Sequence, residues 1–285
     1  MGNIRDIKTR IDSIRNTRQI TNAMKMVASA KLRKAQKGII NARPYADNIN
    51  RMLATIKFKT KETHQKIFIQ PKSDAKTALV VVTADRGLCG SFNSFVIKAA
   101  IQYMNDHPKT DLFCIGKKGF DIFKKKDVKM IKSYTGLFNE MNFNVSIEIA
   151  NDLKQHFFMN KYDHIEVIYN EFKNIMQQNV IHKQVLPIPD VEELEGVSLL
   201  DFLYEPDEDE VIEELTNKYI NVEIWRILLE SSAAEQAARM TAMDNATDNA
   251  TDLIESLTLN YNMVRQAAIT NEIIEIASGA EAQNQ

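Results

Sequence analysis

The chain has 285 residues, of which 44% are hydrophobic and 26% charged, so it can bury a core and is not globally disordered. Its 9 Gly and 6 Pro compare with about 20 and about 14 at average usage, which argues against a turn-rich β-sandwich and favours long helices. Two cysteines make no disulfide framework and indicate a reducing compartment. No apolar run is long enough to cross a bilayer, so we expect no direct lipid insertion.

The two ends of the chain carry opposite charge although the formal net charge is only -2. Residues 1–45 hold eleven Lys and Arg against two Asp, whereas residues 201–285 hold eighteen Asp and Glu against four Lys and Arg. Two interpretations follow: the ends attract each other, or the basic end binds an anionic partner. Residues 1–44 contain no aromatic side chain and carry an apolar seam, so we do not expect nucleic-acid binding.

The N-terminal region reads as a helix, because residues 3–37 contain neither Gly nor Pro. Isoleucines at positions 4, 7, 11 and 14 follow the spacing of a coiled-coil seam. A second apolar strip lies on an adjacent face, at Ile20, Ala23, Met24 and Val27. Gly38 and Pro44 favour a kink. We therefore predict an N-terminal helix over residues 1–57.

The C-terminal region predicts a much longer helix, since Asp207 to Ser278 is free of Gly and Pro for 72 residues. Heptads counted from Ile212 place apolar side chains at fourteen of twenty seam positions. At 1.5 Å per residue such a helix is about 108 Å long, too long for a compact domain of this size, whose radius of gyration is roughly 19 Å. The helix over 207–280 must therefore pack against another helix or inside a partner. The N-terminal helix is the obvious mate, in antiparallel orientation.

Between the helices, strands alternate with helices, which predicts an α/β, Rossmann-like domain over residues 76–190 with a largely parallel sheet. Residues 187–210 read as a linker. The predicted strands are 78–82, 112–115, 128–131, 165–169 and 180–186, and the predicted helices are 92–104, a short one after Gly116, and 145–158.

The chemistry visible in this region is sparse. Neither the glycine loop at 87–92 nor the segment at 116–118 completes a phosphate-binding motif, and the five histidines show no metal spacing. We expect no catalytic residue, no cofactor and no metal. The loop from Asp85 to Gly90 stays open between two interpretations, a functional loop and a simple strand-to-helix turn. From the residues alone, the chain is a mechanical or adaptor part and not an enzyme.

Several long segments resemble the gamma subunit of F-type ATP synthase, in chain order and over nearly the whole chain. They are Arg5 to Thr21, Ala23 to Ala28, Arg43 to Tyr45, Thr83 to Gly90, Ser232 to Met243, Ala246 to Ala250, and Arg265 to Glu272. Residues 57–76 and 187–210 match poorly.

The resemblance implies a non-catalytic central rotor. Its coiled coil stands inside a ring of three alpha and three beta subunits, and its foot joins the epsilon subunit and the membrane c-ring. Rotation couples ion flow to ATP synthesis or hydrolysis at the beta subunits. A bacterial protein, peripheral at the cytoplasmic face of the inner membrane, is expected, because the chain shows no transit peptide. The plastid form of the gamma subunit carries an inserted regulatory dithiol that this sequence does not match, so thiol regulation is not expected.

The resemblance also carries a set of expected contacts with the alpha–beta ring. Charged residues at a wet rotating interface can make contacts that break at little cost. The residues are Met24, Lys25, Asp85, Arg86, Cys89, Arg239, Met243, Arg265, Gln266, Thr270 and Glu275. The alternatives are a coiled-coil adaptor unrelated to any ATPase and a nucleotide-binding Rossmann-type enzyme.

Overall fold

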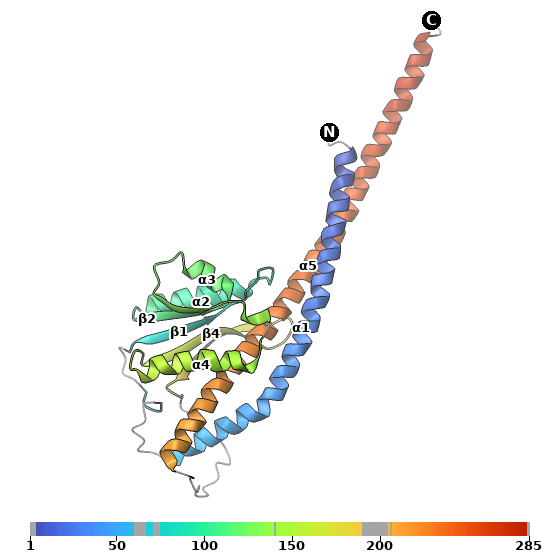
Figure 1. Cartoon of the computed structure of the whole chain (residues 1–285). Coiled ribbons are helices and arrows are strands. Elements are labelled where there is room, and N and C mark those ends of the chain that lie inside the picture. Colours follow the sequence, from blue (N-terminus) through green and yellow to red (C-terminus); the bar gives the residue numbers. More distant parts are fainter. Residues whose placement is uncertain are drawn as a thin grey trace. The chain divides into compact units, whose positions relative to one another are not determined.

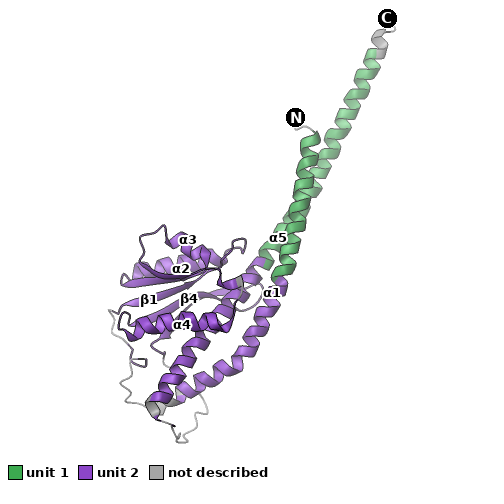
Figure 2. Cartoon of the chain, in the orientation of Figure 1, with its two compact units in different colours: residues 1–28, 240–285 green, residues 29–239 purple. Residues whose placement is uncertain are grey.

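The computed structural model describes residues 4–59, 67–70, 75–139, 141–189, 205 and 207–283. Its elements are α1 (Ile4–Lys59), β1 (Thr77–Val82), α2 (Phe92–Asp106), β2 (Thr110–Ile115), α3 (Lys117–Phe123), β3 (Met130–Tyr134), the 3-10 helix η1 (Leu137–Asn139), α4 (Phe143–Phe158), β4 (His164–Phe172), β5 (Gln178–Leu186) and α5 (Glu208–Gln283) (Figure 1). The chain divides into two compact units, residues 1–28 with 240–285, and residues 29–239 (Figure 2). The division of the chain into domains 1–57, 76–190 and 207–280, which the sequence suggests, stays a prediction.

Both terminal helices are long, as the scarcity of Gly and Pro predicts. α1 has 56 residues and α5 has 76. α1 remains helical through Gly38 and Pro44, and its second half curves (Figure 1). The predicted linker at 187–210 lies mostly outside the described residues.

In the unit of residues 1–28 and 240–285, α1 packs antiparallel to α5 along the predicted seam. Ile11, Thr21 and Ala28, which all belong to the seam, are buried. The Thr21 and Thr247 hydroxyls are 2.7 Å apart, and Lys25, one turn later in α1, pairs with Asp244, one turn earlier in α5. The opposite numbering on the two helices establishes the antiparallel direction.

The unit of residues 29–239 continues the same pairing with small side chains. Leu32 and Ala35 of α1 form a buried cluster with Ala233 and Ala237 of α5. Small residues at facing positions let two helix backbones approach closely, so this part of the pair is held by tight packing.

The sheet in this unit has the order β3-β2-β1-β4-β5. β1, β2, β3 and β4 pair in parallel, and β5 joins the edge antiparallel to β4. The largely parallel α/β sheet is thus confirmed. The third strand is Met130–Tyr134 and not 128–131, because the Val128 amide bonds the Lys126 carbonyl in a turn before the strand begins.

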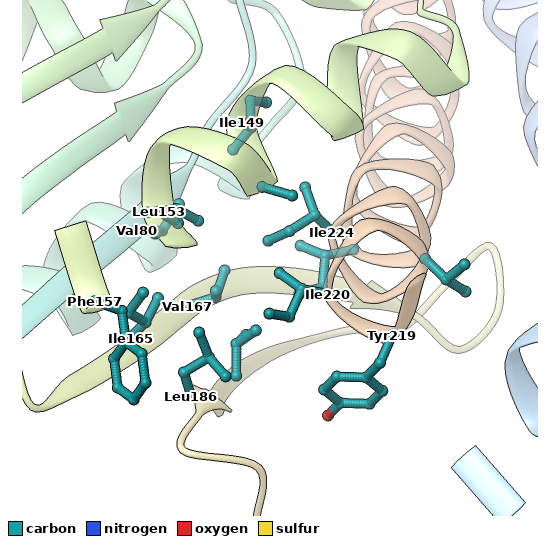
Figure 3. Packing of buried hydrophobic residues seen from close by; sticks show 14 of the residues in the cluster. Val80, Ile149, Leu153, Phe157, Ile165, Val167, Leu186, Tyr219, Ile220 and Ile224 are labelled. Atoms are coloured by element: carbon teal, nitrogen blue, oxygen red, sulfur yellow. The ribbon is translucent and has the colours of Figure 1, made fainter. Parts of the chain in front are cut away.

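The core lies on both faces of the sheet. β1 is buried along its whole length, and its alternate side chains point to opposite faces. Leu79 and Val81 pack with α2 and α3, and Val80 packs with α4 and α5. Figure 3 shows the cluster that contains Val80, in which side chains of α4, β4 and α5 pack around Ile220. The sheet is therefore fastened to α5 by an apolar core, where removing one large side chain costs about 2–5 kcal/mol.

Candidate functional site

The loop after β1 is held by the Asp85 carboxylate. Oδ1 accepts the backbone N–H groups of Lys117 at 3.0 Å and Gly136 at 2.8 Å, and Oδ2 accepts that of Phe138 at 3.3 Å. The carboxylate therefore ties the loop to the start of α3 and to the segment after β3. Asp85 was expected to contact a partner, and within this chain its oxygens serve the loop itself.

The same contacts occupy the backbone N–H groups at the start of α3, next to the glycine at position 116. Backbone N–H groups at the start of a helix bind phosphate only if they are free. At α3 they are taken, because Lys117 N–H bonds Asp85, Lys118 N–H bonds the Ala84 carbonyl, and Gly119 N–H bonds the Thr83 hydroxyl. A carboxylate thus lies where a nucleotide would need to place its phosphate.

The outer face of the loop is formed by Arg86, Leu88 and Gly90, which are exposed. Leu88 is 67% exposed and has a φ of 62°, a left-handed conformation that costs a branched side chain free energy. Leu88 was not among the residues expected to contact a partner. The sequence feature that could have pointed to it is an apolar residue between two glycines of a turn.

Cys89 points the other way and is 1% exposed, in a cluster with Ala84, Phe92 and Ala234. The Asn93 amide donates to its Sγ at 3.2 Å. Burial raises the pKa of the Cys89 thiol, which the charge of Arg239 only partly opposes. The thiol therefore stays protonated and anchors the loop against α5.

Arg239 connects the loop after β1 to α5. It is 9% exposed, donates through Nη1 to the Gly87 carbonyl, and pairs through Nη2 with Oε1 of Glu235 at 2.6 Å. Burial raises the pKa of Glu235, against the opposing charge of Arg239. The arginine therefore neutralises a buried carboxylate and fixes the loop to the helix.

In the other unit, the expected residues lie along the paired helices. Met243 is buried at 5% exposure, and Met24 and Lys25 are half-buried. The second apolar strip of α1 is open, with Ile20 and Val27 60% and 56% exposed. This strip is not covered by the described part of the chain.

The last turns of α5 extend past the start of α1 (Figure 2). All four expected residues there, Arg265, Gln266, Thr270 and Glu275, are exposed. The Arg265 guanidinium lies over the Tyr261 ring at 5.9 Å. Apolar side chains share this surface, with Ile269 at 48%, Ile273 at 60% and Ile276 at 67% exposure. A bare helix with isoleucines on its surface needs a partner to cover them.

Nine of the eleven expected contact residues therefore fall into two groups, and the half-buried Met24 and Lys25 belong to neither. Arg86 and the four residues of the α5 end face outward and are free to touch another chain. Asp85, Cys89, Arg239 and Met243 face inward and hold the loop or the helix pair. Within the described residues, no group of three His, Cys, Asp or Glu side chains is placed to hold a metal ion.

Comparison with known proteins gives a consistent result. A family model described as ATP synthase matches residues 3–283. The ATP synthase gamma chain of Salinibacter ruber is 45% identical, over 99% of this chain and 98% of that protein. The ATP synthase gamma chain of Prosthecochloris aestuarii is 43% identical, over 99% of both.

Solved structures agree in fold. A chain from the central stalk and c-ring of the Tetrahymena thermophila mitochondrial ATP synthase is 29% identical, with a TM-score of 0.63, over 80% of this chain and 99% of that one. A chain of the Euglena gracilis mitochondrial ATP synthase, in rotational state 3, has a TM-score of 0.69 at 20% identity, over 99% of this chain and 95% of that one.

Proposed function

This chain belongs to the family of ATP synthase gamma chains, and from that premise we propose how it works as the central rotor of an F-type ATP synthase. The rotor couples ion flow through the membrane c-ring to ATP synthesis or hydrolysis at the alpha–beta ring. It is not itself catalytic, because catalysis occurs in the beta subunits. Its partners are three alpha and three beta subunits, the epsilon subunit and the c-ring. An adaptor unrelated to any ATPase is not favoured.

The observation that carries the mechanical role is the exposed end of α5. A transmitting shaft needs stiffness along its length and contacts that break as it turns. Stiffness comes from the seam between α1 and α5, where Ile11 and Met243 are buried. The turning contacts come from exposed polar residues, whose ion pairs in water contribute only about 0–1 kcal/mol each and therefore release easily.

We propose three groups of ring contacts. Arg265, Gln266, Thr270 and Glu275 touch the ring at the end of α5, Met24 and Lys25 touch it along the paired helices, and Arg86 touches it from the loop after β1. Asp85, Cys89 and Arg239 hold that loop in position and Met243 holds the helix pair, a role supported by their inward contacts.

Within the described residues, no helix has the length and apolar character that crossing a membrane requires. We propose that the chain lies at the cytoplasmic face of a bacterial inner membrane and reaches it through the c-ring. The bacterial relatives support this placement.

The first experiment co-expresses the chain with cognate alpha and beta subunits and measures ATPase activity of the purified complex with and without it. We expect one copy per three alpha–beta pairs and a higher activity in its presence. Failure to co-purify would contradict the rotor role.

A residue-level experiment uses Arg265→Ala in the complete enzyme in membrane vesicles. Arg265 is exposed, so its loss should leave assembly unchanged and lower ion pumping per ATP hydrolysed. Lys125→Ala, another exposed cation outside the helix pair, is the matched control. Equal pumping ratios in the two variants would refute a contact at Arg265.

A further inference from the structure

A cavity of about 230 Å³ opens within the unit of residues 29–239, between α1, α5 and the segment after β3. Its α1 wall is formed by Lys31, Lys34, Ala35 and Gly38. This spacing of three, one and three residues places the four on one face of the helix. Lys31 and Lys34 are exposed, and Ala35 is buried.

The α5 wall is formed by Trp225, Leu229, Ser232 and Gln236, again one helix face. Trp225 is the only tryptophan of the chain. Its ring meets that of Phe143 edge to face at 6.0 Å and 89°, an arrangement that holds the indole in place.

The third wall is Phe138 with Met141. The Phe138 backbone N–H is bonded to Asp85, so this wall is fastened to the loop after β1. Gly38 allows the Leu229 side chain of α5 to approach α1 closely, since a Cβ at this position would lie 3.0 Å from Leu229 Cδ2. The walls are therefore built from three separate parts of the fold.

The charged side chains that the described residues bring to this cavity are both positive. Two lysines line it, and no carboxylate does among the residues that the structure describes. The same residues supply no ion-pair partner to Lys31 or Lys34. Glu235, which lies near Lys31, is bound to Arg239 instead. An anion at the cavity would thus meet two cations, of which only Lys31 also feels the charge of Glu235, beside an indole, a leucine and a phenylalanine.

We propose that this cavity is a binding site for a small amphipathic anion, an aromatic carboxylate whose ring packs on Trp225 and Leu229 while its carboxylate meets Lys31 and Lys34. An apolar cavity of about 150 Å³ holds benzene, so this larger one accommodates a ring with a short acidic chain. The ligand joins α1 to α5 and to Phe138 and Met141. This inference goes beyond the rotor function and does not depend on it.

The test titrates the full chain with phenylpropionate and follows Trp225 fluorescence, excited where phenyl rings do not absorb. We expect a saturable change in emission that weakens with added salt. Phenylpropionamide and phenylpropylammonium, which share the ring and chain, should bind at least about fivefold more weakly. A linear response, or equal affinity for the amide, would overturn the proposal.

Two variants locate the site. Lys31→Gln with Lys34→Gln should weaken phenylpropionate binding by about five- to tenfold, and Lys37→Gln, an exposed lysine outside the cavity, should leave it unchanged. Ser232→Phe should abolish binding by filling the space. Binding that survives Ser232→Phe with unchanged thermal unfolding would place the ligand elsewhere and refute the site.

The same titration, measured by equilibrium dialysis on the complex with alpha and beta, distinguishes a small ligand in the cavity from a neighbouring subunit that fills it. Retained binding supports a small-ligand site in the assembled enzyme. Binding that the full chain shows and the complex loses would mean that a neighbouring subunit fills the cavity, which would overturn the proposal.

Discussion

The Arg239 guanidinium lies between the Gly87 carbonyl and the Glu235 carboxylate, so that one side chain joins the loop after β1 to α5 and neutralises a buried acid. Oε2 of Glu235 has no hydrogen-bond partner among the described residues, and the side chain is 5% exposed. Such a carboxylate depends on its ion pair with Arg239.

Arg239→Ala should therefore destabilise the chain strongly. Removing one member of a buried pair costs about 3–5 kcal/mol, because the other charge stays buried and unpaired. Urea unfolding of the full chain measures the loss. The double variant Arg239→Ala with Glu235→Gln should recover part of it, and a double variant as unstable as the single one would show that Glu235 is not the cause.

Lys25 and Asp244 provide the contrasting case, since their side chains are 37% and 45% exposed. Water screens such a pair, so Lys25→Gln should lower the free energy of unfolding by less than about 1 kcal/mol. If Lys25 contacts the ring, ion pumping per ATP will fall while thermal unfolding stays nearly constant. A large loss of stability would instead assign Lys25 to the helix pair.

Gly116 and Gly90 both have positive φ, 94° and 56°, but their surroundings differ. A Cβ on Gly116 would lie 1.9 Å from the Thr83 carbonyl oxygen, whereas one on Gly90 meets nothing within 4 Å. Gly116→Ala should cost more than about 4 kcal/mol, or prevent folding, while Gly90→Ala should cost about 1–2 kcal/mol. Comparable melting temperatures would contradict this assignment.

Leu88 holds a left-handed backbone conformation with most of its side chain in water. Asparagine tolerates this conformation better, so Leu88→Asn should stabilise the chain by about 0.5–1 kcal/mol. Calorimetry checks the sign. Ion pumping per ATP tests whether the exposed leucine also has a contact, because a more stable variant with weaker coupling would reveal one.

Asp111 predicts a pH dependence. Burial opposes its ionisation, but donation from Lys129 at 2.9 Å and Tyr162 at 2.8 Å outweighs burial and lowers the pKa of this carboxyl. The unfolded chain then takes up the proton first as pH falls below the ordinary value of 3.8, so stability present above that pH is lost.

Asp111→Asn should accordingly lose about 1–3 kcal/mol at neutral pH and show a flatter stability curve below pH of about 4. Urea unfolding across acidic pH measures both effects. Asp106→Asn, an exposed acid at the end of α2, is the control and should follow the unmodified chain. Parallel curves for Asp111→Asn and the unmodified chain would exclude Asp111 as the source.

Much of the fold was predictable, because its signals are local. The absence of breakers and the heptad spacing anticipated α1 and α5, and the register that begins at Ile4 correctly places Thr21 and Ala28 in the buried seam. Short apolar runs followed by glycine-containing turns anticipated β1 and β2. The start of β3 was misplaced, since a turn at Val128 and pairing with β2 decide it.

The inward or outward direction of the site residues was not predictable in the same way. Arg86 and Asp85 are adjacent charged residues of one loop. Arginine and aspartate are both common at contacts between proteins. Among the described residues, Asp85 alone of the two has a side chain that is bonded within the chain, to N–H groups 32 to 53 residues away in sequence.

By itself, then, the sequence determined two long helices, an α/β sheet and the family, because periodicity, breakers and long motifs are properties of neighbouring residues. The tertiary structure decided which polar side chains are occupied within the chain and which remain free for partners. This choice depends on backbone groups that the fold brings together from distant segments. A polar group that makes its hydrogen bond within the chain is no longer available to a partner.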